Sequence, residues 1–472
     1  MTLITFQAPE YTADDSFETH EFSFEGERDR GWIIRRDHHT ELQLGKGFQL
    51  LRTLVCGVCS TDLGRRFLPH PLPQVIGHEV LCHREGRPVV VEINASCTSR
   101  NLPELCEVCA MGMPTQCVDR ITLGINRLPG GFAPWLLAPV AGIYPVPEGV
   151  GETAVLVEPF AAALHAVLVT PPRSGETVAV LGPRRLGALL IAALAGIRRE
   201  RNLDFHIVAL SRHERHRAMC LELGADRVVD PQQQSGQVDV VFDTTGSPDG
   251  FAKALQLARR AVHLKSTHGK AVLGLERLTQ LVVDELTLLP LSEDALEFSR
   301  NESSTRTNPH IWVSPALGLD DLTALCDPHQ TLHSMTLAQA ALQVDKGTGF
   351  EGSPMKRFDL AVVGNDGDID GAIRPRDSSQ PGLLRPGGAL LLAPDGDFGP
   401  VGQTILEKGI QIHTSRCGDF APALALLAAQ PDLAETLNRN MMTHHFPLAR
   451  IKEAFTVAAD SEKSIKVLVH NP

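Results

Sequence analysis

The sequence predicts an α/β protein in which a β-rich unit precedes a doubly wound parallel sheet. From Gln49 to about Tyr144 the chain consists of short β-like runs broken by Gly and Pro, without a helical period. From Glu158 onward, buried strand patterns alternate with helical patterns. This alternation is typical of a parallel sheet with helices on both faces. A length of 472 residues gives room for two or three domains.

The elements of the second region follow one another in a regular order. A helix is expected at 158–169 ("EPFAAALHAVLV"), a buried strand at 175–182 ("GETVAVLG") and a second helix at 184–197 ("RRLGALLIAALAGI"). Further strands are expected in "FHIVALS", "VDVVFDTTG" and "AVHLKSTHG". The repeated order of strand, helix and strand predicts parallel neighbours in one sheet.

A weak internal echo lies farther along the chain. "VDVVFDTTGSPDGF…AVHLKSTHGK…LTQLVVDELTLLP" resembles the later "FDLAVVGNDGDIDGA…GGALLLAPDG…VGQTILEKGIQIHTS", about one domain length downstream. Either half of an α/β unit has been duplicated, or two unrelated strand-turn segments are alike by chance. The polar segment 299–310, "SRNESSTRTNPH", predicts a surface linker between them.

The overall composition excludes several classes of protein. Hydrophobic residues make up 43% and charged residues 21% of the chain, and no apolar run approaches the length of a membrane-spanning helix. The first residues, "MTLITFQAPEYTADDSFETHEF", are acidic and do not resemble a secretion or transit signal. A formal net charge of -12 argues against a nucleic-acid partner. We therefore expect a cytoplasmic protein that binds neither nucleic acid nor a membrane.

Four cysteines form the tightest motif in the sequence. Cys106, Cys109 and Cys117 lie close together, with Cys97 upstream. Four thiolates complete the tetrahedral coordination of zinc, which predicts a closed structural site. Ten cysteines in a cytosolic chain also favour metal binding over disulfides. The alternative is a set of scattered free cysteines, which does not explain the clustering.

A second potential zinc site begins in the stretch 54–80, "LVCGVCSTDLGRRFLPHPLPQVIGHEV". Cys59, His78 and Glu79, joined by the distant Glu158, offer sulfur, nitrogen and carboxylate oxygens. Such a mixed set leaves room for water or substrate, which is the arrangement of a catalytic zinc.

Two neighbouring side chains fit supporting roles at this second site. Thr61 would pass a proton between a zinc-bound oxygen and solvent, and Asp62 would orient His78. Two other interpretations compete with the zinc site. "GHE" alone is a weak motif, because a His beside a Glu is more often a surface pair. Cys56 and Cys59 form a CxxC, which suggests thiol redox chemistry, but no thioredoxin-like βαβ pattern surrounds it.

Taken together, these motifs resemble one known family. "CGVCSTDL", "GHE", the cysteine cluster, "VEPFAAALHAV", a strand with a glycine turn and "FPLARIKEAF…KSIKVLV" occur in the order found in the zinc-dependent medium-chain dehydrogenase/reductase family, the alcohol dehydrogenase superfamily. The resemblance covers most of Gln49 to Leu291 and about Ile410 to the C-terminus. It implies a GroES-like catalytic domain, a Rossmann cofactor domain and a zinc that polarises an alcohol or carbonyl oxygen.

The resemblance also assigns roles to single residues. Glu158, in "VEPF", resembles the glutamate of the polyol and threonine dehydrogenase branches rather than the cysteine of the simple-alcohol branch. By the same motifs Cys59, His78 and Glu158 resemble the catalytic-zinc ligands, Glu79 a close or alternating ligand, and Thr61 the proton-relay hydroxyl. Cys97 departs from the pattern because it lies farther upstream of the other cysteines than is usual in the family.

The expected cofactor turn departs from the family pattern as well. "AVLGPRRLGALL" supplies Gly182 and Gly187, with Leu186 before the second glycine, but Arg184 stands at the middle glycine of G-x-G-x-x-G. That glycine normally lets the backbone approach a pyrophosphate, and a side chain there crowds it. Arg184 would instead reach a phosphate oxygen with its own charge.

Residues after the next strand favour NADP(H) over NAD(H). An Asp or Glu there would bind the ribose hydroxyls of NAD, whereas this chain has Ser211 and Arg212, which suit a 2′-phosphate. The alternative is that Arg212 is a solvated residue at a helix start. By resemblance, Thr245 and Gly246 lie near the nicotinamide ribose, and Lys466 is a late basic contact to the pyrophosphate.

The chain is longer than most members of the family, and the excess is concentrated near 292–407. We expect this segment to be an inserted α/β unit, which "FDLAVVG…LLRPGGALLLAPDG" suggests is a partial Rossmann duplication without a phosphate loop. The predicted domains are 1–160 (GroES-like), 161–291 (first part of the Rossmann domain), 292–407 (insertion), 408–444 (last part of the Rossmann domain) and 445–472 (return to the catalytic domain).

The predicted activity is hydride transfer between NADP(H) and a secondary alcohol, a polyol or the corresponding carbonyl. Phe67 and His70 would line the substrate pocket, or would simply pack their loop. The alternative is a non-catalytic protein, derived from a dehydrogenase, that acts in binding or assembly through its insertion. The resemblance suggests a homodimer or tetramer, but the insertion could block the usual edge pairing of the sheet.

Overall fold

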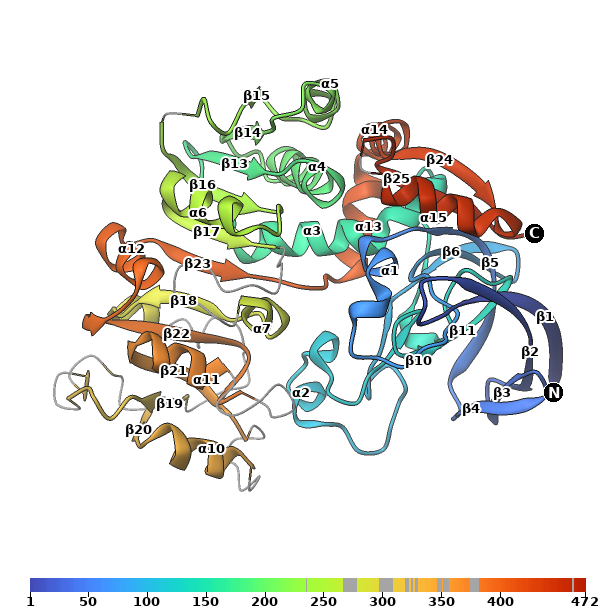
Figure 1. Cartoon of the computed structure of the whole chain (residues 1–472), viewed down its shortest axis with the longest axis horizontal. Helices are drawn as coiled ribbons and strands as arrows, with labels where there is room; N and C mark the ends of the chain where they lie inside the picture. The colour runs from blue at the N-terminus through green and yellow to red at the C-terminus, as the bar shows by residue number, and fades with distance from the viewer. Residues whose placement is uncertain are drawn as a thin grey trace. The chain divides into compact units, whose positions relative to one another are not determined.

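The chain forms two compact units in a computed structural model. The structure describes residues 1–234, 236–265, 278–296, 309–318, 322–323, 326, 330–345, 350, 356–373, 382–460 and 462–472. Unit 1 combines Met1–Ala163 with Cys417–Pro472, and unit 2 comprises Leu164–Arg416 (Figure 1). The predicted combination of a β-rich unit with a largely parallel α/β sheet is confirmed.

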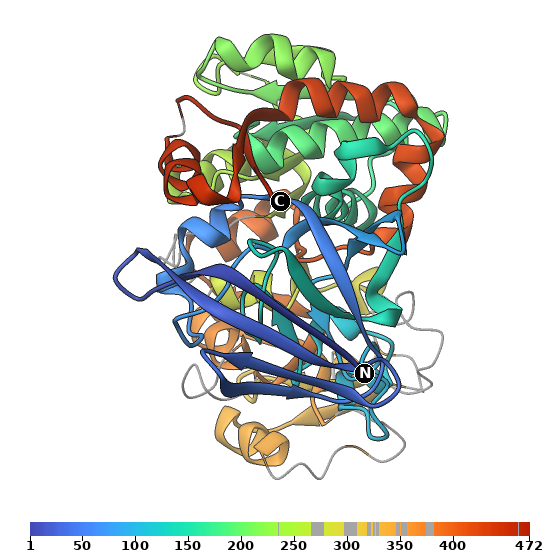
Figure 2. The ribbon, with the colours of Figure 1, turned by 90° about the vertical axis from the view of Figure 1, so that its right-hand side faces the viewer.

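Unit 1 begins with an antiparallel sheet, whose strands are coloured blue in Figure 2. Apolar residues alternate along these strands, so that one face joins the core of the unit, for example through Phe22 and Phe24 of one strand and Trp32 and Ile34 of the next. The strands are β1 (Thr2–Tyr11), β2 (Phe17–Glu27), β3 (Gly31–Arg36) and β4 (His39–Leu44).

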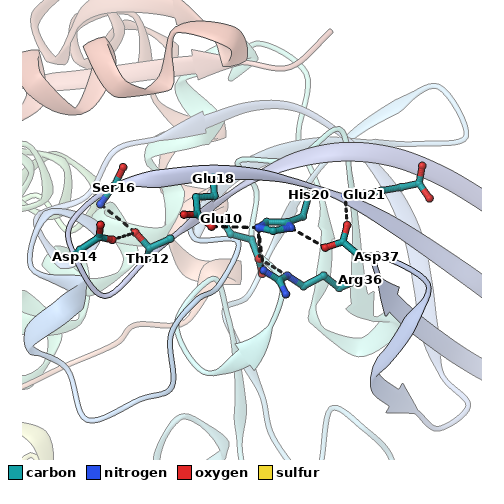
Figure 3. Close-up of polar contacts among 9 residues, drawn as sticks. All are labelled: Glu10, Thr12, Asp14, Ser16, Glu18, His20, Glu21, Arg36 and Asp37. Carbon is teal, nitrogen blue, oxygen red and sulfur yellow. Dashed lines mark hydrogen bonds and ion pairs between the residues drawn. The ribbon is translucent and has the colours of Figure 1, made fainter.

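The apolar face of this sheet ends in a polar network (Figure 3). Glu10, His20 and Arg36 continue the same alternation as the apolar residues. Arg36 donates to Glu10 and, from Nη2, to His20 Nε2 at 2.9 Å. Because an arginine cannot accept a hydrogen bond, the proton of the His20 ring is on Nδ1, which lies 2.7 Å from Asp37 Oδ2. Polar pairs therefore replace apolar contacts where this face meets solvent.

A seven-stranded mixed sheet forms the centre of unit 1. Its order is β12-β7-β6-β5-β25-β24, with β11 also paired to β5. The last strand of the chain runs antiparallel to β5, with Val469 opposite Cys56, so that the C-terminal segment completes this sheet. The strands are β5 (Phe48–Gly57), β6 (Glu79–Arg84), β7 (Arg87–Val91), β11 (Trp135–Pro139), β12 (Ile143–Pro145), β24 (Met442–Pro447) and β25 (Lys466–His470).

Short elements complete unit 1. A small sheet contains β8 (Asn94–Ala95), β9 (Ile121–Leu123) and β10 (Arg127–Leu128). The α-helices are α1 (Ser60–Leu63), α2 (Glu107–Ala110), α3 (Val157–Val169), α13 (Phe420–Ala429), α14 (Pro431–Met441) and α15 (Ile451–Ala459), of which α3 continues into unit 2. The 3₁₀ segments are Arg65–Phe67, Pro114–Gln116, Val140–Gly142, Gly151–Leu156 and Leu448–Arg450.

One helical stretch is longer and more apolar than the sequence analysis allows. Gly151–Val169, which includes α3, is long and apolar enough to cross a membrane by length and composition alone, and 61% of its apolar window is buried inside the structure. The expectation that no apolar run reaches this length is therefore wrong. A mostly buried core helix meets the same criteria.

Unit 2 is built on one eleven-stranded sheet of order β15-β14-β13-β16-β17-β23-β18-β22-β21-β19-β20 (Figure 1). Neighbouring strands are parallel except β18 and β23, which are antiparallel. The strands are β13 (Thr177–Leu181), β14 (His206–Leu210), β15 (Arg227–Val229), β16 (Val238–Asp243), β17 (Ala258–Leu264), β18 (Thr287–Pro290), β19 (His310–Val313), β20 (Thr331–Ser334), β21 (Phe358–Asn365), β22 (Leu384–Asp397) and β23 (Gln411–Thr414).

Helices lie between most of these strands, and the central strands are almost wholly apolar, as expected for a sheet buried on both faces. The helices are α4 (Arg185–Glu200), α5 (Arg215–Glu222), α6 (Pro248–Leu257), α7 (Leu278–Val283), α10 (Leu337–Asp345), α11 (Asp366–Ile373) and α12 (Pro400–Lys408).

The division of the chain differs from the predicted domains in two respects. The strands of 292–407, expected as a separate insertion, lie in the same sheet as β13 to β17. Of the segment 408–444, β23 joins this sheet, but the chain belongs to unit 1 from Cys417 onward. The predicted linker 299–310 lies outside the described residues except for its last two, and the last, His310, begins β19.

Candidate functional site

The first potential metal centre lies where β5 ends and β6 begins. Cys59 is the N-cap of α1, directly after β5, and Glu79 pairs with Gly57 across the two antiparallel strands. One ligand atom from each of Cys59, His78 and Glu79 lies within 4.8 Å of the others. His78 is 2% and Glu79 0% exposed. The structure therefore brings together three of the four ligands that the sequence predicts.

Asp62 supports this group from α1. Its Oδ2 accepts a hydrogen bond from Cys59 N at 2.9 Å, and its Oδ1 lies 3.3 Å from His78 Nδ1. Burial lowers the pKa of His78, but the negative charges of Asp62 and Cys59 outweigh burial and raise this pKa well above its usual value. His78 Nδ1 and Asp62 Oδ1 are buried without a well-aligned hydrogen bond. The surroundings of His78 thus favour positive charge beside sulfur, nitrogen and oxygen donors, and this donor set fits zinc.

Lys466 holds Glu79 from the C-terminal strand. Its Nζ lies 2.7 Å from Glu79 Oε1, donates also to Oε2, and approaches Val58 O at 3.4 Å. The side chains of Lys466 and Glu79 are 3% and 0% exposed, so each charge depends on the other. Gly57 leaves room for the pair, since a Cβ there would lie 2.4 Å from Glu79 Oε2.

The sequence does not reveal this buried ion pair. The sequence predicts a pyrophosphate contact for Lys466, whereas the structure gives its ammonium to Glu79. Nothing in the local pattern connects the two residues, which are 387 positions apart.

The other residues predicted around this centre are placed as follows. Glu158 lies in the first turn of α3, outside the group of ligand atoms within 4.8 Å. Thr61 lies in α1, and its N–H donates to Cys59 Sγ at 3.5 Å. Phe67 is 76% exposed, so it does not pack the interior of its loop, whereas His70 is partly buried.

Glu92 is a titratable residue near Glu158 that the sequence analysis does not single out. Burial is the largest cause that raises the carboxyl pKa of Glu92, and the charges of Glu158 and Asp419 add to it. Hydrogen bonds from Asn94 act in the opposite direction, and together these effects bring the pKa to about 7. One of these bonds runs from Asn94 N to Glu92 Oε1 at 3.1 Å. The only sequence signal is an acidic residue at the end of the buried strand in "PVVVEIN".

Glu92→Gln is expected to change the pH dependence of stability. The pKa of Glu92 is raised from 4.5 to about 7 in the folded protein, so between these pH values the folded state binds this proton more tightly than the unfolded state does. The contribution of the protonated Glu92 carboxyl to the free energy of unfolding is therefore lost as pH rises from about 4.5 through 7. The difference in unfolding free energy between variant and wild type should grow by roughly 3 kcal/mol from pH 4.5 to pH 8. Urea unfolding at both pH values measures it.

The control for this prediction is Glu148→Gln, which removes one carboxylate from an exposed loop position. The difference in unfolding free energy between Glu148→Gln and wild type should stay nearly constant from pH 4.5 to pH 8. An equal pH response of the two variants would show that Glu92 is not the group responsible.

The second potential metal centre is the cysteine cluster. One sulfur from each of its four members lies within 4.8 Å of the others; Cys97 and Cys117 Sγ are 3.4 Å apart and Cys106 and Cys117 Sγ 3.8 Å. These separations exclude disulfides and match ligands of one zinc, where tetrahedral Zn–S bonds of about 2.3 Å put sulfurs about 3.8 Å apart. Burial raises the pKa of the Cys97 and Cys117 thiols. The long loop before the last three cysteines, Cys106, Cys109 and Cys117, therefore still closes on Cys97.

A third group of potential ligands lies elsewhere in unit 1. Glu152, His445 and His470 offer one ligand atom each within 4.8 Å of one another. His445 Nδ1 and His470 Nε2 are 2.9 Å apart, so the two rings also contact each other directly. The group is more exposed than the two centres above.

The glycine turn between β13 and α4 is the potential cofactor site of unit 2. Gly182 has φ 83°, and a Cβ there would lie 2.9 Å from Thr245 Cγ2. At Gly187 a Cβ would lie 2.5 Å from Gly182 O, so both predicted glycines are required by close packing. Arg184 is the N-cap of α4, and its N–H donates to Gly182 O at 2.7 Å; Leu186 lies in the first turn of the helix.

The other predicted cofactor residues lie at the carboxyl ends of β14 and β16. Ser211 follows β14, and its Oγ accepts a hydrogen bond from the backbone two residues later at 3.1 Å, while Arg212 is exposed. Thr245 and Gly246 follow β16, and Thr245 donates through N and Oγ1 to Asp243 Oδ1 at 2.9 and 2.7 Å. Since β13, β14 and β16 are parallel, these residues share one edge of the sheet with the glycine turn.

The chain is similar to known dehydrogenases, although no family model matches it. It is 31% identical to (R,R)-butanediol dehydrogenase of Bacillus subtilis strain 168 over 263 residues, which are 47% of this chain and 70% of that relative. It is 25% identical over 238 residues to the starvation-sensing protein RspB of Escherichia coli K12, with 45% and 67% covered. The chain spans 67% of the length of RspB, 59% of (R,R)-butanediol dehydrogenase of Saccharomyces cerevisiae and 64% of L-threonine 3-dehydrogenase of Aeromonas hydrophila, so each match covers only part of the relative.

Solved structures resemble the whole chain. RspB of E. coli CFT073, described as an alcohol dehydrogenase complexed with NADH, has a TM-score of 0.58 at 16% identity, with 99% of both chains covered. A zinc-binding dehydrogenase of Sinorhizobium meliloti 1021 bound to NADP has a TM-score of 0.53 at 17% identity, with 100% of both chains covered. These similarities show the shared fold. Together with the butanediol dehydrogenase match and the order of the motifs, they show that the chain belongs to the zinc-dependent medium-chain dehydrogenase/reductase family.

Proposed function

We propose that the protein is a zinc-dependent oxidoreductase that transfers a hydride between NADP(H) and a secondary alcohol, a polyol or the corresponding carbonyl. The observation that carries this proposal is the group formed by Cys59, His78 and Glu79, with ligand atoms within 4.8 Å of one another. It combines sulfur, nitrogen and oxygen donors with few protein ligands, as a catalytic zinc does. Relatives named as butanediol, threonine and sorbitol dehydrogenases support this substrate class.

In the proposed mechanism, Cys59, His78 and Glu79 or Glu158 would hold the zinc. When bound, zinc acts as a Lewis acid that lowers the pKa of an alcohol or polarises a carbonyl. The Oγ1 of Thr61 would receive the proton that the alcohol loses and pass it toward solvent. Asp62 would fix the ring of His78, since its Oδ1 lies 3.3 Å from Nδ1.

For the cofactor, we infer that the pyrophosphate binds at the turn of Gly182 to Gly187, with Arg184 contributing charge where the family has a glycine. Ser211 and Arg212 would contact the 2′-phosphate, which is the basis for the preference for NADP(H). Thr245 and Gly246 would lie near the nicotinamide ribose. Of the similar solved structures, one is complexed with NADH and another is bound to NADP, so the proposed preference rests on the residues of this chain.

Fluorescence titration of the zinc-replete protein is expected to show tighter binding of NADPH than of NADH. Arg212→Gln should weaken NADPH binding about tenfold or more, the value of a charge-assisted hydrogen bond, and change NADH binding little. The control is Arg201→Gln, which changes an exposed arginine at the C-terminal end of α4, whereas the glycine turn lies at the N-terminal end of this helix. Equal binding of the two nucleotides by wild type would contradict the assignment of Ser211 and Arg212.

The second candidate function is non-catalytic binding or assembly, and Arg184 in the cofactor turn favours it. A side chain at this position crowds a bound pyrophosphate. If neither nucleotide binds at millimolar concentration in the same titration, this candidate replaces hydride transfer.

A further inference from the structure

We propose that the sheet of unit 2 contains two copies of one strand-helix unit that exchange their last strands. The pairing of β18 with β23 would then be an internal two-fold interface, which occupies the sheet edge where a second chain would otherwise pair. This inference does not depend on hydride transfer.

The strand order repeats on the two sides of the β18–β23 junction. Outward from β23 the order is β17, β16, β13 and β14, and outward from β18 it is β22, β21, β19 and β20. On each side, the first strand in the chain (β13 or β19) lies between the second (β14 or β20) and the later strands. Within each side, neighbouring strands pair in parallel. The pairing of β18 with β23 at the junction is antiparallel, so the strands of the two sides run in opposite directions. A two-fold axis at the junction produces this arrangement.

Equivalent positions on the two sides make the same hydrogen bond. Asp239 is the second residue of β16 and accepts from the N–H of Thr177, the first residue of β13, at 2.8 Å. Asp359 is the second residue of β21 and accepts from the N–H of His310, the first residue of β19, at 2.9 Å. Of these strands, β16 and β21 begin the two segments whose sequences echo each other. The shared hydrogen bond makes chance similarity the weaker explanation for the echo.

The register at the junction also obeys two-fold symmetry. Leu288 and Ile412 are the Cα partners there, and each is the second residue of its strand. Each strand is preceded, two residues before its start, by a residue in the left-handed region, Glu285 at φ 54° and Gly409 at φ 65°. On a two-fold axis a residue must face its own equivalent, and Leu288 and Ile412 do so.

The connections show that the last strands are exchanged. In the first copy the chain runs from β17 through α7 to β18, but β18 pairs with β22 of the second copy. In the second copy the chain runs from β22 through α12 to β23, but β23 pairs with β17 of the first copy. Consecutive parallel strands usually stay in one half of a sheet. Helix α12, which precedes β23, also contacts the first copy. Lys408 at the end of α12 donates to Leu255 O at 2.7 Å and to Gln256 O at 2.9 Å, both in the last turn of α6.

The exchange covers a sheet edge that would otherwise be free. Leu288 and Ile412 are 0% exposed, and both strands are hydrogen-bonded on each side. Unpaired edges are the usual points of sheet-to-sheet association. Among the described strands of this sheet, only β15 and β20 are terminal, so sheet pairing between two chains would have to use one of these edges rather than β18 or β23.

The second copy has a closed crevice where the first has its glycine turn. At the end of β21, the N–H of Gly364 donates to Asp368 Oδ2 at 3.1 Å, and Asn365 Nδ2 donates to the same oxygen at 3.0 Å. A Cβ at Gly364 would lie 3.3 Å from Leu317 Cδ2, so the loop after β19 fills the space beside it. An internal carboxylate thus takes the donors that an anion would need.

A designed disulfide tests the internal interface. Leu288→Cys with Ile412→Cys joins two directly opposed residues, whose Cα atoms lie about 4.5 to 5.5 Å apart in antiparallel pairs, a separation that a disulfide spans. The control pairs Leu289→Cys with Ile412→Cys, because Leu289 packs on the opposite face of the sheet. After oxidation, we expect the first pair to give the mapped cross-link within a single chain of 51.2 kDa, and the control to give none.

Two results would overturn the proposal. Cross-linked peptide found only in a species of twice the mass would show that the strands are exchanged between two molecules. Absence of the cross-link in a folded variant, as judged by circular dichroism, would show that the two strands are not paired.

The wild-type chain provides a second measurement that needs no substitution. An amine-reactive cross-linker should join Lys253 of α6 to Lys408 of α12, because the Lys408 ammonium contacts the last turn of α6. Peptide mapping after size separation should place this cross-link in the monomer fraction. Its occurrence in the dimer fraction alone, or in neither fraction, would contradict an exchange within one chain.

Discussion

Cys59→Ala is expected to lower turnover about 10³-fold or more and to reduce the zinc content by one ion per chain, with the fold largely retained. In the proposed mechanism Cys59 would supply the sulfur ligand of the first potential metal centre, and without it the Lewis-acid contribution of several kcal/mol would be lost. The Cys59 side chain belongs to a short capping turn rather than to the core, so stability should change little. Metal analysis, circular dichroism and steady-state kinetics measure the three quantities.

The matched control is Cys56→Ala, three residues earlier. Cys56 is 0% exposed, its Sγ packs beside Gly77 and Gly131, and it is not a member of the potential zinc-binding group of Cys59, His78 and Glu79. A zinc centre predicts that this variant keeps its metal and most of its activity. If both variants lose activity equally while the zinc stays bound, the CxxC acts as a dithiol pair and the zinc mechanism is wrong.

Lys466→Met is expected to lower the free energy of unfolding by about 3–5 kcal/mol, because it leaves the carboxylate of Glu79 buried without its partner. The double variant Glu79→Gln with Lys466→Met should recover most of this loss, since both charges are then removed. Chemical denaturation of the wild type, both single variants and the double variant forms a complete thermodynamic cycle.

The same variant separates the two interpretations of Lys466. If this residue acts mainly on a pyrophosphate, as the sequence predicts, Lys466→Met should weaken NADPH binding and leave stability within about 1 kcal/mol of wild type. If it acts on Glu79, the loss of stability should appear in the protein without nucleotide. A stable variant with unchanged nucleotide binding would contradict both interpretations.

The sequence is a good guide where neighbours in the chain are also neighbours in space. The spacing of Cys106, Cys109 and Cys117 predicts a metal loop because a short loop can close on one ion with little loss of entropy. Asp62 lies within hydrogen-bonding distance of Cys59 N, three residues away, and at 3.3 Å from His78, as expected from one short loop. The strand and helix patterns of 175–264 are likewise confirmed, because a buried parallel strand is recognisable from its own residues.

The sequence fails where distant segments meet. The ion pair of Lys466 with Glu79 depends on the pairing of β25 with β5, which no local pattern reveals. The segment 292–407 has strands of ordinary composition, and only their registers show that they extend one sheet rather than form a domain of their own. The raised pKa of Glu92 similarly depends on burial and on Glu158 and Asp419, which tertiary structure brings near it.

The position of β25 also sets the order of events during synthesis. Lys466 follows Glu79 by 387 residues, so Glu79 leaves the ribosome long before Lys466 does. During that interval the Glu79 carboxylate has no ammonium of Lys466 to pair with. Until β25 docks against β5, burial of that carboxylate is unfavourable, and the end of β6 must remain solvated. Pairings at such long separation form slowly, because the entropy of closing the loop is lost before the contacts are gained. The potential metal centre is therefore expected to form only after β25 has been synthesised and has paired with β5, so that zinc would enter unit 1 at a late stage of its folding.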